Sequence, residues 1–150
     1  MTTMRTRTGG SGNLTLALWA GLALSLIGGV APLIDMATVD SLSAHVRQAY
    51  PQWPADLVGK DRDAIAYSLA AVGGLGAAVW AVSLWAVAKG RRWTRGLVTS
   101  AFAVGTLVAL TCASLSGDQY DQVLPPVYSA LVLLPSLAGL AAVVLVWRRR

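Results

Sequence analysis

Long apolar stretches alternate along the chain with short segments that hold nearly all of its charges. Four apolar stretches cover residues 14–36, 64–88, 97–115 and 127–147. A helix rises about 1.5 Å per residue, so about 20 apolar residues cross the hydrocarbon core of a bilayer. None of the stretches shows the alternating period of a half-exposed strand. The pattern predicts four membrane-spanning helices, because a chain of 150 residues cannot bury four all-apolar helices in water.

Two of the three connections, 89–96 and 116–126, are short, which favours antiparallel neighbours. We therefore predict an all-α, membrane-embedded, up-down four-helix bundle over residues 14–147. Residues 1–13, rich in Gly, Ser and Thr, are expected to form a disordered N-terminus, and 148–150 a basic tail. The first stretch is longer than a usual signal-peptide core, and Pro32 directly follows its best cleavage site. It is expected to remain as a helix.

The first connection, 37–63, is long enough to hold a helix of its own. Its apolar residues recur at helical spacing: Val39, Leu42, Val46 and Ala49. This pattern predicts a short amphipathic helix that lies on the membrane or caps the bundle. Thr38 is the expected N-cap of this helix and Pro51 its end. Tyr50 and Trp53 are expected at the membrane interface.

Composition agrees with a membrane protein and limits its chemistry. Hydrophobic residues make up 55% of the chain and charged residues 13%. Cys112 is the single cysteine, so the chain has no intrachain disulfide and no Cys-x-x-Cys pair. Arginine outnumbers lysine ten to two and glutamate is absent, which is typical of a GC-rich bacterial genome.

Charge is distributed unequally between the two sides of the predicted bundle. One side, formed by the two termini and the turn 89–96, holds nine cations and no acid: Arg5, Arg7, Lys89, Arg91, Arg92, Arg95, Arg148, Arg149 and Arg150. The other side, formed by 37–63 and 116–126, holds three cations and all seven aspartates if Asp35 is included. Cytoplasmic loops retain Lys and Arg, so both termini are expected to be cytoplasmic in a cell-membrane protein.

The segment "KGRRWTR", 89–95, is interpreted as the tight cytoplasmic turn of a helical hairpin. Gly90 relieves the end of the helix, and Trp93 lies at headgroup depth. The cations of this side are expected to attract anionic lipid, at about 1 kcal/mol each near the surface. Nucleic-acid binding is not expected, because seven residues beside a membrane provide no groove-reading element.

Small residues recur four positions apart on two of the predicted helices. They predict close helix packing, either inside the bundle or at the seam of a homodimer. The positions are Gly21, Ser25 and Gly29 in the first stretch and, in the second, one of two pairs, either Ala70 with Gly74 or Gly73 with Ala77.

The third stretch has a polar side. Five hydroxyl residues fall within a sector of roughly 140° at about 100° per residue: Thr99, Ser100, Thr106, Thr111 and Ser114. Such hydroxyls bond to nearby carbonyls or line a path for a substrate. No ionisable residue lies in the central part of any stretch, which argues against proton relays and voltage sensors. We expect no cofactor and no metal, since the one histidine excludes paired axial histidines for haem.

A polar set near the end of the first stretch is the candidate for catalysis. Asp35, Asp40 and His45 fall within a few residues of one another, and Asp118 or Asp121 could join them in an acid–base or metal site. The alternative is a solvated, helix-capping set. Asp61 and Asp63 are interpreted in that way, as caps at the start of the second span.

The hairpin "WAVAKGRRWTRGLV", 85–98, between Gly- and Ala-rich spans resembles small four-helix bacterial integral membrane proteins. The resemblance implies the fold and no activity or site residue. The chain lacks the membrane glutamate of small multidrug exporters and the cysteines of membrane thiol oxidoreductases.

The favoured functional prediction is a non-enzymatic accessory or interaction subunit that binds a membrane-protein partner or a second copy. One alternative is a small carrier or channel for a neutral or apolar molecule, with one copy or two forming the functional unit. The other is a membrane enzyme that acts on a lipid or apolar substrate from the Asp35, Asp40 and His45 end.

Overall fold

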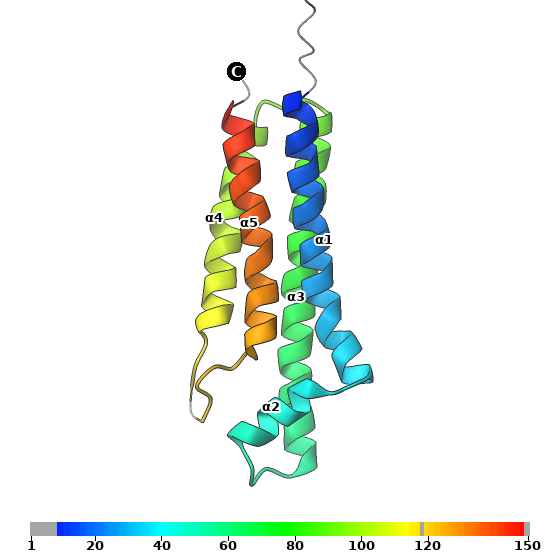
Figure 1. The fold of residues 1–150 in the computed structure, drawn as a ribbon, viewed down its shortest axis with the longest axis vertical. Coiled ribbons are helices and arrows are strands. Elements are labelled where there is room, and N and C mark those ends of the chain that lie inside the picture. The colour runs from blue at the N-terminus through cyan, green and yellow to red at the C-terminus, as the bar shows by residue number, and fades with distance from the viewer. Residues whose placement is uncertain (1–8, 118, 149–150) are drawn as a thin grey trace, which may run out of the picture.

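The computed structural model describes residues 9–117 and 119–148, and its elements are helices (Figure 1). In chain order they are α1 Gly9–Ala37, α2 Ser41–Ala49, α3 Ala55–Ala88, α4 Thr94–Ser114 and α5 Pro126–Arg148. Across these described ranges no strand forms, and Gly117 and Tyr120 make one isolated bridge. The predicted all-α class is confirmed. In the same ranges, α1, α3, α4 and α5 are long and apolar enough to cross a membrane.

The four long helices lie side by side (Figure 1). The start of α1, the α3–α4 connection and the end of α5 lie at one end, which we call the turn end. α2 and the α4–α5 connection lie at the other end, which we call the cap end. α1 packs along α3 and α5, and α5 packs along α4, whereas α3 and α4 touch far less. The side between α3 and α4 is therefore the least closed.

Small residues bring α1 and α3 into close contact. A Cβ atom added to Gly73 would lie 2.5 Å from the Cα atom of Gly29, so the two backbones touch. Nearer the turn end, the Trp80 ring covers Gly21, and its Nε1 donates a hydrogen bond to Ser25 Oγ at 3.1 Å. Gly21, Ser25 and Gly29 are the small residues that recur four positions apart in the sequence. They face α3 of the same chain.

The small residues of α3 divide between two faces. Gly73 faces α1 and is buried, whereas a Cβ at Gly74 would meet nothing within 4 Å. Ala77 is half-buried. Of these small residues, Gly73 touches α1 at Gly29, and the Ala70 carbonyl also approaches Gly29.

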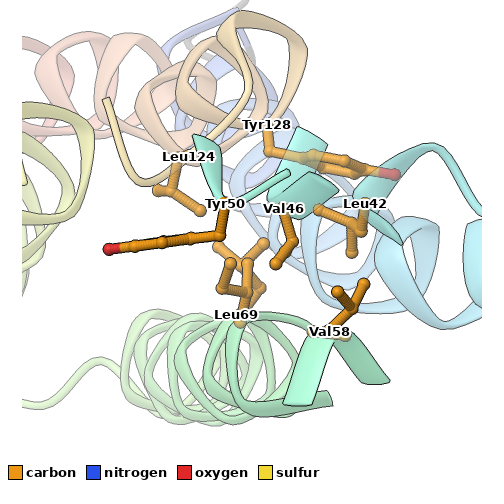
Figure 2. Close-up of a cluster of buried hydrophobic side chains, with 9 residues drawn as sticks. Leu42, Val46, Tyr50, Val58, Leu69, Leu124 and Tyr128 are labelled. Atoms are coloured by element: carbon orange, nitrogen blue, oxygen red, sulfur yellow. The ribbon is translucent and has the colours of Figure 1, made fainter. Parts of the chain in front are cut away.

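Two buried clusters join the helices at opposite ends. At the turn end, the cluster connects α1, α4 and α5 through Leu14, Leu18, Val98, Ala142 and Val146. At the cap end, a second cluster connects α2, α3, α5 and the α4–α5 connection, and Figure 2 shows its side chains converging from these segments. Its members include Leu42, Val46, Tyr50, Val58, Leu69, Leu124 and Tyr128.

α2 caps the bundle through the apolar side that the sequence predicts. Leu42 and Val46 are fully buried, while Val39 precedes the helix and is 80% exposed. The expected interfacial position of Tyr50 is wrong, because its side chain is buried in the cap-end cluster. Trp53 stacks on it at 3.8 Å between ring centroids.

The start of α2 differs from the prediction. Thr38 does not cap it: Thr38 Oγ1 donates to the carbonyl of Ile34 at 2.8 Å. Asp40 adopts a left-handed conformation, with φ of 54°, which delays the helix to Ser41. The carboxylate of Asp35 accepts a hydrogen bond from the Leu42 amide at 3.2 Å and satisfies one of the free amides of the first turn.

α3 begins at Ala55 rather than at residue 64, so the cap interpretation of Asp61 and Asp63 is wrong. Both lie inside the helix, and Asp56 is the acid of the first turn. The 34 residues of α3 span about 51 Å, well beyond the roughly 30 Å core of a bilayer. At the other terminus, residues 9–13 start α1 instead of being disordered, and 1–8 lie outside the described residues.

The α3–α4 turn ends α3 in a Schellman motif. Gly90, with φ of +61°, donates to the carbonyl of Val87 at 3.1 Å, and the Arg91 amide donates to that of Ala86 at 3.1 Å. Thr94 begins α4, and its hydroxyl lies 3.2 Å from the Ala86 carbonyl. Only glycine adopts this conformation without strain, which explains why Gly90 follows the last turn of α3.

The contact between Gly29 and Gly73 generates a stability prediction. We expect Gly73→Ala to destabilise the protein by about 1–3 kcal/mol, because the new methyl group forces the α1 and α3 backbones apart. Gly74→Ala is the matched control. It should be neutral or stabilising by up to about 1 kcal/mol, because alanine favours helix and its Cβ meets open space. Thermal unfolding in detergent measures both, and equal melting temperatures would contradict the α1–α3 contact.

Candidate functional site

A cavity of about 390 Å³ lies between the two buried clusters, within the size range of small-molecule sites. All four long helices contribute to its wall. The wall includes exposed residues of α3 and α4: Leu75, Val79, Val104 and Val108. Because α3 and α4 touch little along this length, the cavity opens between them. These four side chains form the rim of the opening, which we call the mouth.

Each of the four long helices contributes glycine to the wall. Gly28, Gly73, Gly76, Gly105 and Gly139 line the cavity. The Phe102 ring covers Gly139, where an added Cβ would lie 2.8 Å from the ring, and the Trp80 ring approaches the same glycine at 3.4 Å. Gly105 differs from these positions, because nothing lies within 4 Å of an added Cβ. The two aromatic rings therefore form a firm wall toward the turn end, and Gly105 borders free space.

The wall of the cavity contains no charged residue. Its side-chain polar groups come from Ser25, Trp80, Thr106 and Ser136. Ser25 and Trp80 satisfy each other through their hydrogen bond. An uncharged, largely apolar wall disfavours an ion and suits a neutral apolar molecule, since unpaired charge in such surroundings is costly.

The structure separates the five hydroxyl residues of α4. Thr106 lines the cavity. The others point elsewhere: Thr99 Oγ1 accepts from Trp147 Nε1 at 3.0 Å, Thr111 donates to the Leu107 carbonyl at 2.9 Å, Ser114 donates to the Thr111 carbonyl at 3.2 Å, and Ser100 is exposed. The five hydroxyl residues spread over a sector of roughly 140° of the helix surface. One of them can therefore face the cavity while the others face different neighbours.

The cap end places Asp35, Asp40 and His45 with separate partners. The Asp35 carboxylate accepts a hydrogen bond from the Leu42 amide, and Asp40 Oδ2 accepts one from Arg62 Nη1 at 3.2 Å. His45 Nε2 lies 3.0 Å from the Gln122 carbonyl, and its ring stacks on Tyr120 at 5.4 Å. Within 9–117 and 119–148, no group of three or more His, Cys or acidic side chains is placed to hold a metal. Asp118 lies outside those ranges, and Asp121 is exposed.

Hydrogen bonds and ion pairs attach the cap to α3. Arg62 joins Asp40 to Asp63, with an Nη2–Oδ1 distance of 2.7 Å to the latter. Tyr120 donates to Asp61 Oδ2 at 2.6 Å. Burial, with that hydrogen bond, raises the pKa of Tyr120 above its ordinary value, so the phenol remains a donor at physiological pH.

The Asp40 carboxylate is stabilised in its charged form. Burial acts to raise its pKa, but hydrogen bonding to Ser43 and the charge of Arg62 outweigh burial and hold the pKa below its ordinary value. Asp40 therefore remains an anion and cannot supply a proton at neutral pH. Its role in the structure is to hold Arg62.

Cations and tryptophans surround the turn end. The guanidinium of Arg91 lies 5.2 Å from the Trp85 ring centroid, and that of Arg95 lies 5.7 Å from the Trp147 centroid. The other described cations of this end are exposed: Lys89, Arg92 and Arg148. Arg5, Arg7, Arg149 and Arg150 lie outside the described residues.

Comparison with protein-family models, curated proteins and solved structures finds no match.

The link between Arg62 and Asp40 generates a prediction about the cap. Arg62→Gln should speed tryptic cleavage after Arg47 in α2 by up to about fivefold, because a partly exposed ion pair contributes up to about 1 kcal/mol to cap docking. Cleavage requires local opening of the helix. Fragment mass spectrometry measures the rate. Lys60→Gln is the control, since the Lys60–Asp56 pair is long, at 4.0 Å, and exposed, and no acceleration is expected. Equal cleavage of both variants would show that Arg62 does not hold the cap.

Proposed function

We propose that this chain is a multi-pass membrane protein that binds a neutral apolar molecule from the bilayer in the cavity between α3 and α4. The observation that supports this function is the cavity itself, with its volume of about 390 Å³ and its uncharged wall. A ligand enters laterally through the mouth between α3 and α4. This function corresponds to the carrier predicted from the sequence, because a carrier must first bind the molecule that it moves.

The proposal includes a membrane-embedded, up-down arrangement of α1, α3, α4 and α5. Their length and apolar composition support it. The residues of the mouth support it too, because Leu75, Val104 and the other exposed apolar side chains are compatible with lipid. The first turns of α3, with Asp56 to Asp63, extend beyond the hydrocarbon core together with α2.

The proposed orientation places the turn end in the cytoplasm of a cell and the cap end outside. Cations without acids at the turn end support it, as do the exposed tryptophans Trp85, Trp93 and Trp147 at headgroup depth. Anionic lipid is then the partner of the exposed cations.

Binding is favoured over catalysis by the positions of the candidate acids. Asp35, Asp40 and His45 contact separate partners at the cap end, and none of them lines the cavity.

A helix–helix interaction is the second candidate function. The outward face of α3 presents the exposed small residues Ala71, Gly74 and Ala78, which suit the close approach of a partner helix or a second copy.

The cavity function is tested with bromododecane, whose bromine quenches tryptophan on contact. We expect bromododecane to quench the protein in lipid nanodiscs, and Trp80→Phe to remove part of that quenching, because Trp80 lies in the wall. Gly105→Leu should weaken this Trp80-dependent quenching about tenfold or more. A side chain at the mouth excludes methylene groups from the cavity, each contributing about 0.8 kcal/mol.

Gly96→Leu is the matched control for Gly105→Leu. It lies on the same helix, its added Cβ also meets open space, and it does not line the cavity. Its quenching should equal that of the unmodified protein. Absence of Trp80-dependent quenching in the unmodified protein would refute the binding function and leave the helix–helix interaction as the better account.

The orientation has its own test. A fluorescent protein that matures only in the cytoplasm, fused after the C-terminus, should be fluorescent in cells, because the basic turn end is retained on that side. A periplasmic phosphatase fused at the same position should be inactive. Phosphatase activity without fluorescence would reverse the orientation.

A further inference from the structure

We propose that the cavity holds one acyl tail of an anionic phospholipid whose headgroup binds the cationic α3–α4 turn. This inference rests on the membrane-embedded binding function proposed above and names the class of its ligand. The mouth of the cavity lies between α3 and α4, and the turn that joins these two helices carries Lys89, Arg91 and Arg92. Figure 1 shows this turn at the end of the same helix pair.

The cations of the turn are available to bind an anion. Lys89, Arg91 and Arg92 are exposed, and no ion pair joins them to any other residue that the structure describes. The Arg91 guanidinium lies 5.2 Å from the Trp85 ring centroid, a cation–π contact that positions the group and leaves its charge without a carboxylate. Phosphate suits such a cluster, because a guanidinium group binds it through two parallel N–H···O bonds and lysine binds it as a point charge.

The surroundings of these cations favour a lipid headgroup over a dissolved phosphate. Trp85 and Trp93 are both about half exposed, and their ring centroids lie 6.2 Å apart beside Arg91. Exposed tryptophans of this kind lie at headgroup depth in membrane proteins. A lipid brings an apolar tail that packs on the exposed rings, whereas a dissolved phosphate gains nothing from them. The ligand is therefore an amphiphile with a phosphate group and an apolar tail.

An exposed apolar path on α3 connects the turn with the mouth. Trp85, Val82, Val79 and Leu75 follow one another at spacings of three, three and four residues, so each lies beside the next on the helix surface. All four side chains are between 40% and 69% exposed. Val79 and Leu75 form the α3 side of the mouth. A tail that starts at the turn can therefore reach the mouth in continuous apolar contact.

The depth of the mouth matches the distal part of a tail. At about 1.5 Å per residue, Val79 lies about 9 Å and Leu75 about 15 Å along α3 from Trp85. One leaflet is about half of the roughly 30 Å hydrocarbon core, so the mouth faces the part of the leaflet near the bilayer midplane. The Trp80 and Phe102 rings close the cavity toward the turn end. The tail therefore passes outside these rings and enters the cavity sideways through the mouth.

The cavity suits the tail and excludes the headgroup. Its wall contains no charged residue, so the phosphate stays at the turn, where cations are present. Its volume of about 390 Å³ is near the lower end of the range of small-molecule sites, about 300–1,000 Å³, and is too small for a whole two-tailed lipid. The neutral apolar group inside the cavity is then one segment of a charged molecule.

The test compares two lipid probes that differ only in the headgroup, phosphatidylglycerol and phosphatidylcholine with bromine near the middle of each acyl chain. Each probe is a minor component of nanodiscs made from unbrominated phosphatidylcholine, and the readout is the quenching that Trp80→Phe removes. The anionic probe should quench at an apparent affinity at least about fivefold higher than the zwitterionic probe. Gly105→Leu should abolish this difference, because the tail no longer enters at the mouth.

Paired charge variants identify the headgroup site. Arg91→Gln with Arg92→Gln should lower the preference for the anionic probe about fivefold or more and leave bromododecane quenching unchanged. Arg47→Gln with Lys60→Gln is the matched control, because it removes two exposed cations of the cap end and should not alter the preference. If the Arg91 and Arg92 variant does not fold, the salt dependence of the unmodified protein replaces it. The preference should then fall as salt rises, since salt screens exposed charges.

The outcomes separate this inference from the cavity function. Equal quenching by the two lipid probes, with bromododecane still quenching Trp80, would overturn the inference and leave the cavity function intact. A preference for the anionic probe that persists in Gly105→Leu would also overturn it, because the lipid would then bind the turn without placing a tail in the cavity. A preference that does not respond to the charge variant or to salt would show that the turn does not hold the headgroup, against the inference. Absence of Trp80-dependent quenching by all probes would overturn the cavity function and the inference together.

Discussion

The contact between Gly29 and Gly73 is the constraint on which the rest of the structure depends. α3 touches α4 only slightly, so apart from the cap-end cluster its connection to the other half of the bundle runs through α1, which packs on both α3 and α5. Hydrophobic attraction does not hold apolar helices together in lipid, and close backbone contact takes its place. Side chains larger than hydrogen at these positions would separate α3 from α1 and remove one wall of the cavity.

The cavity results from packing that is complete at both ends and incomplete in the middle. The turn-end cluster holds α4 against α1 and α5, and the cap-end cluster holds α3 against α2 and α5. Between them, the cavity is lined by residues of all four long helices, at least one glycine from each among them. Void space of this size forgoes dispersion contacts, and in a bilayer an apolar chain can supply them. The same incomplete packing in the middle of the bundle therefore accounts for both the cavity and its lateral mouth.

The sequence predicts the helices well, because long apolar stretches, a glycine after α3 and a proline after α2 act locally. It predicts the apolar side of α2 but places Thr38 as its cap, because spacing does not reveal the left-handed turn at Asp40, whose amide bonds to the Asp35 carbonyl. The charges of Asp61 and Asp63 end the apolar stretch and so predict a helix start there, whereas α3 begins at Ala55 and includes both. The cavity depends on which small residues oppose each other, and spacing within one helix does not specify its partner. Thr106 was among five hydroxyl residues, and only the positions of neighbouring helices single it out.

α4 is fixed at its two ends and little supported between them. Its start is tied to Ala86 of α3 through Thr94, and its end leads into the connection that Tyr120 attaches to Asp61. Along its middle, α5 is the main neighbour. Because α4 is attached at both ends, outward bending would displace its middle most and would leave both attachments in place. Under the proposed cavity function, molecules of different girth would be accommodated by outward bending of α4 between its two attachments.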